Sequence, residues 1–136
     1  MNTVVADASF CGAWMLPDEM SAAAEDLLEE ALRGTVELRM PSLWSYEMAN
    51  LLKSAFRRGR LSRKAVREAA EALGHVPVRF MDVPNAAART RILEIAMKHE
   101  LSAYDAAYFE LAQRFKAPLR TADKNLRLAW EKETAH

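Results

Sequence analysis

Apolar residues along the chain follow two kinds of pattern, short unbroken runs and longer segments with helical spacing. The short runs are rich in β-branched residues and predict buried strands. The longer segments repeat apolar residues every three or four positions, which predicts helices with one buried face. The expected strands cover 3–6, 36–40, 78–83 and 118–121, and the expected helices cover 10–16, 21–33, 42–58, 62–73, 85–98, a segment from 102 onward and a last one ending near 132. This alternation predicts a three-layer α/β/α fold with a central, mostly parallel sheet of about four to five strands.

The helix expected over 42–58 carries an acid beside its buried stripe. The stripe consists of apolar residues at helical spacing, Trp44, Met48, Leu51 and Ala55. At 100° per residue, Glu47 lies about 40° from Leu51, on the border of that stripe. A desolvated carboxylate is costly unless it is paired or bound to a metal, and the same border offers only Asn50 and Ser54. A place near the helix N-terminus, where the helix dipole favours an acid, is an alternative explanation for Glu47.

The helix that begins after Ser102 repeats this arrangement. Its expected stripe is formed by large apolar and aromatic residues, Tyr104, Tyr108, Leu111 and Phe115. Asp105 lies beside Ala112 on the border of the stripe, without a basic neighbour. Asp105 also follows Ser102 by three residues, the spacing of a capping box, so a purely structural role is an alternative.

Two further acids follow strands. Asp7 comes directly after the first expected strand, and Asp123 comes just after the last one. In open α/β sheets, ligands bind outside the carboxyl ends of parallel strands, so both acids lie at the edge where sites are built. Either residue can instead cap the helix that follows it. Capping and ligand binding are compatible, and four acids in such places favour a shared site.

Composition restricts what that site can be. The 136 residues suit one domain spanning 1–136, and a net charge of zero names no partner. The lone Cys11 excludes an internal disulfide and is typical of a buried thiol in a reducing compartment. The three histidines show no ligand spacing, which argues against a zinc site. No leader peptide and no run long enough to span a membrane is present, so we expect a cytoplasmic protein.

Convergent carboxylates without histidines suit a hard cation. Mg²⁺ takes oxygen ligands and is usually held by a few carboxylates together with a substrate phosphate. Such an ion can activate water and neutralise charge on a phosphodiester, whereas bare carboxylates would repel it. The pattern therefore predicts metal-dependent phosphodiester hydrolysis.

The four acid-bearing stretches resemble the PIN-domain family of ribonucleases, and most of all the VapC-type toxins of toxin–antitoxin pairs. The matching stretches occur in the family's order and read VVADAS, SLWSYEMANLL, LSAYDAAYFELAQ and PLRTADKNL. The resemblance implies a PIN-like fold and an endoribonuclease that uses Mg²⁺, for which Mn²⁺ can substitute. It also implies a cognate VapB-like antitoxin and a homodimer. Trp14, Met15 and Trp130 can contribute to a dimer interface, although core positions are the default expectation.

The resemblance also assigns roles to individual residues. Asp7 and Asp105 would be metal ligands. Glu47 would complete the site and orient water, and Asp123 would hold a second ion or a water on the metal. The supporting polar positions would be Thr121, Ser9 and Asn50; a strand-end hydroxyl and an exposed amide are the plain alternatives for the last two.

A basic stretch begins on the helix that carries Glu47. Residues 53–67 contain seven Lys and Arg residues and no acid. Phosphate contacts supply most sequence-independent affinity for nucleic acids, so this stretch is a candidate RNA contact, or a contact with an antitoxin. The residues expected to make it are Lys53, Arg57, Arg58 and Arg60. Solvated helix ends are the alternative.

Two other functions compete with the nuclease hypothesis. The first is a non-catalytic PIN-like module that binds RNA or protein. Four uncompensated carboxylates argue against it, since a scaffold has no use for them. The second is a phosphotransfer domain of receiver-like topology. It would need a nucleophilic Asp at the end of a central strand and a basic partner near the phosphate, and no clear lysine lies at the end of a late strand.

Overall fold

Four parallel strands form the centre of the molecule. The computed structural model describes residues 2–19 and 21–135. Its strands are β1 (Asn2–Ala6), β2 (Val36–Pro41), β3 (Val78–Met81) and β4 (Leu119–Arg120). They lie in the order β3-β2-β1-β4, and every pairing is parallel. The chain therefore moves outward from β1 in one direction and returns to its other side with β4. The carboxyl ends of β1 and β4 flank a topological switch point, where α/β folds place their sites.

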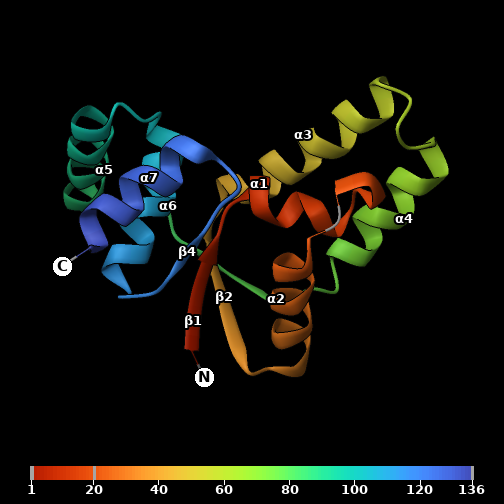
Figure 1. Cartoon of the computed structure of the whole chain (residues 1–136), viewed down its shortest axis with the longest axis horizontal. Coiled ribbons are helices and arrows are strands. Elements are labelled where there is room, and N and C mark those ends of the chain that lie inside the picture. The colour runs from red at the N-terminus through yellow and green to blue at the C-terminus, as the bar shows by residue number, and fades with distance from the viewer. Residues whose placement is uncertain (1, 20, 136) are drawn as a thin grey trace.

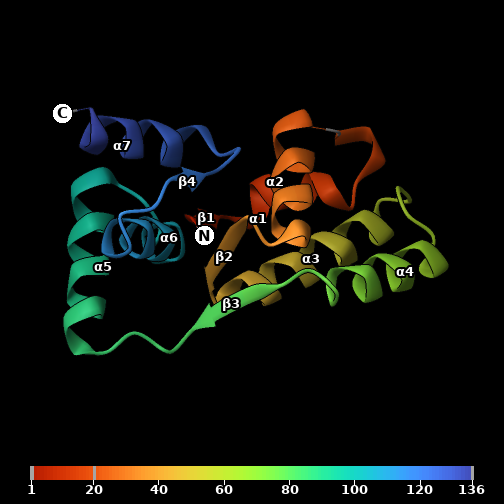
Figure 2. The same ribbon diagram turned by 90° about the horizontal axis from the view of Figure 1, so that it is seen from below.

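Helices cover both faces of the sheet. Figure 2 shows α2 (Ala22–Arg33), α3 (Leu43–Arg57) and α4 (Arg63–Leu73) on one side. The other side carries α5 (Ala86–His99) and α6 (Ala103–Arg114), and α7 (Lys124–Thr134) packs against α6. The short helix α1 (Ala8–Cys11) and two 3-10 turns, η1 (Gly12–Trp14) and η2 (Pro17–Glu19), lead from β1 to α2. The three-layer α/β fold expected from the sequence is confirmed.

Polar caps define where most helices begin. Side-chain oxygens of Ser21, Ser62, Asn85 and Ser102 accept hydrogen bonds from backbone N–H groups in the first turns of α2, α4, α5 and α6. Each cap satisfies a donor that the helix itself leaves unpaired. Gly34 ends α2 with a φ of 77°, a left-handed conformation that glycine adopts at little cost. Local chemistry thus determines several of the boundaries that carry the chain back to the sheet.

The core joins the sheet to the helices on both faces. Its largest fully buried side chains include Leu38, Met40, Met48, Tyr108 and Phe109. The Cys11 thiol is fully buried, as expected.

The three residues considered for a dimer interface pack on this core. Met15 is buried. Trp14 donates from Nε1 to the Ala24 carbonyl at 2.7 Å, and Trp130 meets Phe109 edge to face at 5.1 Å between ring centroids. These contacts favour the core alternative for all three residues.

The buried stripe expected on α6 is wrong in one position. Tyr108 and Leu111 are buried, but Tyr104 is 67% exposed. Since α6 touches β1, β2, β4, α5 and α7, its central residues are buried on several sides and do not follow a single stripe. Tyr104 lies in the first turn, outside this packing.

The remaining differences concern element ends. The first helix begins at Ala8, two residues earlier than expected, because Asp7 caps it. The strand β3 ends at Met81, and β4 has only two residues. Within residues 2–19 and 21–135, no helix combines the length and apolar character needed to cross a membrane.

Candidate functional site

Asp7 lies where β1 turns into α1, and its carboxylate is bound on both oxygens. Oδ1 accepts hydrogen bonds from the Ser9 hydroxyl at 2.7 Å and from the Phe10 N–H at 3.0 Å, so Asp7 is the N-cap of α1. Oδ2 accepts a hydrogen bond from the Thr121 hydroxyl. The side chain is only 4% exposed, and burial raises its pKa. The three hydrogen bonds lower that pKa but do not offset the desolvation.

The hydroxyls of Ser9 and Thr121 connect the ends of β1 and β4. The two oxygens lie 3.2 Å apart, Ser9 Oγ accepts from the Ala122 N–H at 3.0 Å, and Thr121 Oγ1 accepts from the Asp123 N–H at 3.0 Å. Figure 1 shows the segment between β4 and α7 beside the start of α1. Both residues thus support Asp7, and they hold the beginning of α7 against it.

Glu47 reaches the same region from α3. It is half-buried, and its Oε1 accepts a hydrogen bond from the Tyr108 hydroxyl of α6 at 2.5 Å. Desolvation raises the pKa of Glu47, the charges of Asp7 and Asp105 raise it further, and the bond from Tyr108 lowers it. No acid lies in the first turn of α3, so the helix-dipole alternative does not account for Glu47.

Asp105 occupies the first turn of α6, as its spacing from Ser102 predicts. Its backbone N–H donates to the Ser102 hydroxyl at 3.1 Å, so Asp105 takes part in the helix cap, as the structural alternative expects. Its side chain has a second role, however. The carboxyl is half-buried, and desolvation and the charges of Asp123 and Asp7 raise its pKa. The residue therefore belongs both to a helix start and to a group of interacting acids.

Asp123 is also both a cap and a member of this group. Its Oδ1 accepts a hydrogen bond from the Leu126 N–H at 2.9 Å, which begins α7. At the same time its charge raises the pKa of Asp7 and Asp105. Capping alone would not need a position beside two other carboxylates.

We call Asp7, Glu47, Asp105 and Asp123 the acidic cluster. Among the described residues, none of the four forms an ion pair with Lys, Arg or His. Within residues 2–19 and 21–135, no group of three or more acidic, His or Cys side chains is arranged so that it could hold a metal ion. The donor set nevertheless fits a hard cation, since it consists of carboxylate oxygens that repel one another and lack a counter-charge.

Asn50, the third supporting position, is not part of this network. It is exposed on α3, and it makes no hydrogen bond within the described residues. Its plain alternative, an exposed amide, describes what the structure shows.

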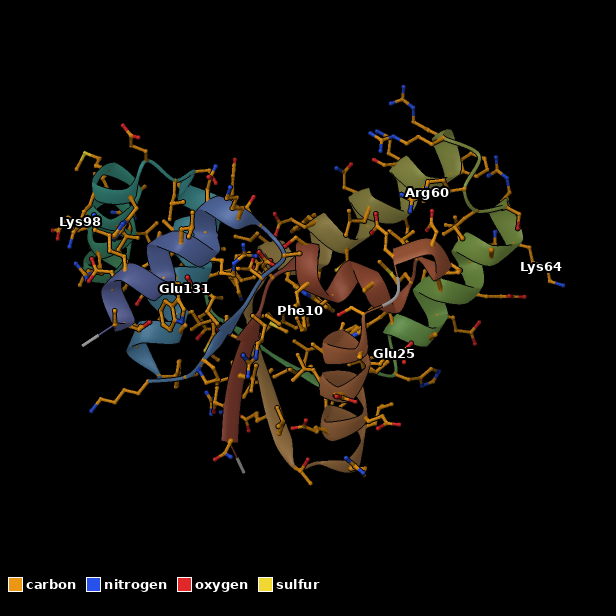
Figure 3. The ribbon with its side chains drawn as sticks, viewed as in Figure 1. Phe10, Glu25, Arg60, Lys64, Lys98 and Glu131 are labelled. Carbon is orange, nitrogen blue, oxygen red and sulfur yellow. The ribbon has the colours of Figure 1, made fainter. Side chains whose placement is uncertain are left out.

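Most of the basic stretch lies away from the acidic cluster, whereas Lys53 is about 9 Å from Glu47 along α3. Lys53, Arg57 and Arg58 are exposed, and Arg57 lies about 15 Å along α3 from Glu47 at 1.5 Å per residue. Arg60 differs, because its guanidinium donates to both Asp18 carboxylate oxygens, at 2.6 and 3.1 Å. Figure 3 shows Arg60 and Lys64 at the end of the α3–α4 pair, far from α7. The free charge of the stretch is therefore carried by residues other than Arg60.

Sequence reasoning did not assign a role to Tyr108. The stripe analysis treated it as a core residue, and it is fully buried, but its hydroxyl also holds Glu47. The available signal was general: a buried tyrosine hydroxyl usually needs a hydrogen-bond partner. Glu110 was also missed as a buried acid, and its partner Arg114 lies four residues on, at 2.8 Å. Arg114 neutralises Glu110, so Glu110 is not one of the unpaired acids that make up the acidic cluster.

Comparison with known proteins identifies the family and the fold of the chain. The sequence matches the model of the PIN domain over residues 4–130. It is 32% identical over 127 residues to Ribonuclease VapC3 from Pyrobaculum aerophilum, covering 90% of this chain and 91% of that protein. The fold is similar to the crystal structure of PAE2754 from Pyrobaculum aerophilum, with a TM-score of 0.71 and 21% identity over 95% of this chain and 84% of that one. Since the domain model spans nearly the whole chain and the relative aligns along most of both sequences, the chain belongs to the PIN-domain family and is a homologue of Ribonuclease VapC3.

Proposed function

We propose that this protein is a Mg²⁺-dependent endoribonuclease that hydrolyses RNA phosphodiester bonds and acts as the toxin of a VapBC-type pair. The observation that carries the proposal is the acidic cluster. Burial and the charges of neighbouring acids raise the pKa of Asp7, Glu47 and Asp105, Asp123 adds a fourth carboxylate, and none of the four forms an ion pair among the described residues. Such an arrangement is costly in the folded protein and is explained if the site binds a divalent metal. The homology to a protein named as a ribonuclease supports the substrate class.

The four acids have different roles in the proposed reaction. Asp7 and Asp105 would hold Mg²⁺, with Mn²⁺ as a substitute, and Asp123 adds a carboxylate for a second ion or for ordered water. The cation would supply charge neutralisation for the phosphodiester and activation of water. Glu47 is suited to orient the attacking water and take its proton, because burial and its acidic neighbours raise its pKa.

The hydroxyls and Tyr108 act as positioning groups. Thr121 and Ser9 fix the Asp7 carboxylate through both of its oxygens. Tyr108 fixes Glu47 with a single bond to Oε1, which leaves Oε2 for the reaction. A carboxylate held in this way loses little conformational entropy when substrate arrives.

The proposed partners follow from the toxin role. A VapB-like antitoxin would neutralise the nuclease in the cytoplasm, and the enzyme would act as a homodimer. Exposed Lys53, Arg57 and Arg58 suit either RNA phosphate or an acidic surface of the antitoxin. Arg60 can join them only by exchanging Asp18 for another anion.

The test is cleavage of labelled RNA by purified protein with Mg²⁺ or with excess EDTA. We expect cleavage with Mg²⁺ only, leaving a 5′-phosphate and a 3′-hydroxyl. Asp7→Asn and Asp105→Asn should each abolish cleavage while leaving the circular dichroism spectrum unchanged, because Asn keeps the shape of Asp without its charge. Asp26→Asn, an exposed position on α2, is the matched control. Full cleavage in EDTA, or RNA binding without any cleavage, would contradict the proposal; the latter would favour a non-catalytic binding module.

A further inference from the structure

Each of the three tyrosines of the chain is next to a carboxylate of the acidic cluster, either in sequence or through a hydrogen bond. Tyr108 is buried and binds Glu47. The other two directly precede a carboxylate of the cluster: Tyr46 precedes Glu47 on α3, and Tyr104 precedes Asp105 on α6. These two rings are 78% and 67% exposed, respectively. Two large aromatic faces are therefore presented to solvent on the two helices that carry Glu47 and Asp105.

Their placement relative to the carboxylates follows from helix geometry. Successive Cα atoms are about 3.8 Å apart, and successive side chains of a helix diverge by about 100°. Each ring therefore begins beside its carboxylate and turns outward, away from the core. Tyr108, whose hydroxyl bonds Glu47 of α3, follows Tyr104 by four residues and Asp105 by three, so both lie one turn of α6 from the residue that contacts Glu47. The two exposed rings therefore come from the two helices that this bond joins.

An isolated exposed aromatic residue is ordinary on a protein surface. What distinguishes this pair is that each ring directly precedes a carboxylate of the acidic cluster, on two helices that the Tyr108–Glu47 hydrogen bond joins. Exposed Lys53, about 9 Å from Glu47 along α3, and exposed Lys124, directly after Asp123, can contact phosphates. Neither offers a flat face for a base, which an aromatic ring does. Aromatic rings stack on unpaired bases of any sequence, whereas paired bases hide their faces within the duplex.

We propose that Tyr46 and Tyr104 are stacking platforms for unpaired bases next to the scissile phosphodiester. This inference rests on the proposed ribonuclease function. In this proposal the rings are positioning groups. Each ring holds one base, and the phosphodiester between the stacked nucleotides lies at the carboxylates.

The experiment uses a 5′-labelled, mixed-sequence single-stranded oligoribonucleotide that the wild-type protein cuts, together with the same strand in a duplex. We expect Tyr46→Ala and Tyr104→Ala each to lower kcat/KM on the single strand by roughly 5- to 100-fold, mainly through KM, in the range measured for loss of one stacked base. Tyr46→Phe and Tyr104→Phe should keep wild-type kinetics, since they keep the ring. Met97→Ala, which removes a 65% exposed side chain on α5, is the control and should change nothing.

A second set of substrates tests stacking directly. An abasic ribose is placed in turn at each position around the cut, which removes one base and keeps the phosphates. At the position that faces a ring, base removal should slow the wild-type protein but should not slow the matching Ala variant any further. Equal slowing of both proteins at every position, Phe variants as slow as Ala variants, or duplex cut as fast as single strand would overturn the inference. Wild-type protein that cuts none of these RNAs with Mg²⁺ would instead overturn the proposed function.

Discussion

The hydroxyl of Tyr108 on α6 donates a hydrogen bond to Oε1 of Glu47 on α3, across 61 positions of sequence. The two helices lie on opposite sides of the sheet, so this bond forms where the layers meet at the carboxyl ends of the strands. It connects a fully buried aromatic residue of the core to a half-buried acid of the candidate site. Core packing thereby determines the position of an acid of the candidate site.

Tyr108→Phe should raise the pKa of Glu47. The hydrogen bond from Tyr108 stabilises the charged carboxylate and lowers the pKa of Glu47. Without it, desolvation and the charges of Asp7 and Asp105 raise that pKa further. The acidic limb of the pH–rate profile should move to higher pH, and the free energy of unfolding should fall by about 1 kcal/mol. Titration of the Glu47 carboxyl by NMR measures the shift without relying on activity. An unchanged Glu47 titration would mean that the bond does not hold in solution.

Stability of the metal-free protein should fall as the pH rises above the ordinary carboxyl range. Burial raises the folded-state pKa of Asp7, Glu47 and Asp105 above the ordinary values of 3.8 for Asp and 4.5 for Glu. Between the unfolded and the folded pKa values the unfolded chain gives up its protons first, so the free energy of unfolding decreases with rising pH. The contribution of these groups is fully present below the unfolded pKa values and is lost as the pH passes the raised ones.

The comparison of wild type with Asp105→Asn isolates the contribution of Asp105 together with the effect of its charge on Glu47, because acids outside the cluster titrate alike in both proteins. In EDTA, the advantage of the variant should grow as the pH rises above the ordinary Asp value of 3.8 and through the raised pKa of Asp105. Urea unfolding at several pH values measures it. Parallel curves of stability against pH for the two proteins would show that Asp105 is not strained by its neighbours.

Asp123→Asn should separate capping from charge. Asn caps a helix as well as Asp, so the bond to the Leu126 N–H is kept while repulsion on Asp7 and Asp105 is removed. In EDTA the variant should be more stable by about 1 kcal/mol, or a few degrees in Tm. Mg²⁺ should stabilise it less than wild type, since stabilisation follows affinity for the folded state. Melting curves identical to those of wild type in both conditions would leave Asp123 as a cap alone.

Replacing Arg57 and Arg58 together by Ala should weaken RNA binding at every sequence. Both are exposed and outside the ion pairs that bind Arg60, so their charges are available to phosphate. The slope of log Kd against log salt should become shallower by roughly one for each phosphate that the variant no longer neutralises. Arg33→Ala with Arg79→Ala removes the same charge elsewhere and is the control. If RNA affinity is unchanged while a VapB-like partner no longer binds, the residues serve the antitoxin.

Much of the fold was predictable from local patterns in the chain. The runs at 3–6 and 36–40 became β1 and β2, and polar caps such as Ser62 and Asn85 began helices where their chemistry favours it. The order of strands and helices implied a parallel sheet, because right-handed crossovers leave few alternatives. Asp7 and Asp123 could be placed at one sheet edge, since both follow strands that run in the same direction.

The sequence by itself therefore determined the elements, their order and the acids at their ends, which depend on interactions between residues a few positions apart. Only the tertiary structure decided that Tyr104 is exposed while Tyr108 is buried, and that Tyr108 binds Glu47. The same holds for Arg60, whose charge is taken up by Asp18 across 42 positions. These outcomes depend on how helices pack against the sheet and against each other. Helical periodicity describes one direction of burial, whereas α6 is enclosed on several sides and its first turn is not.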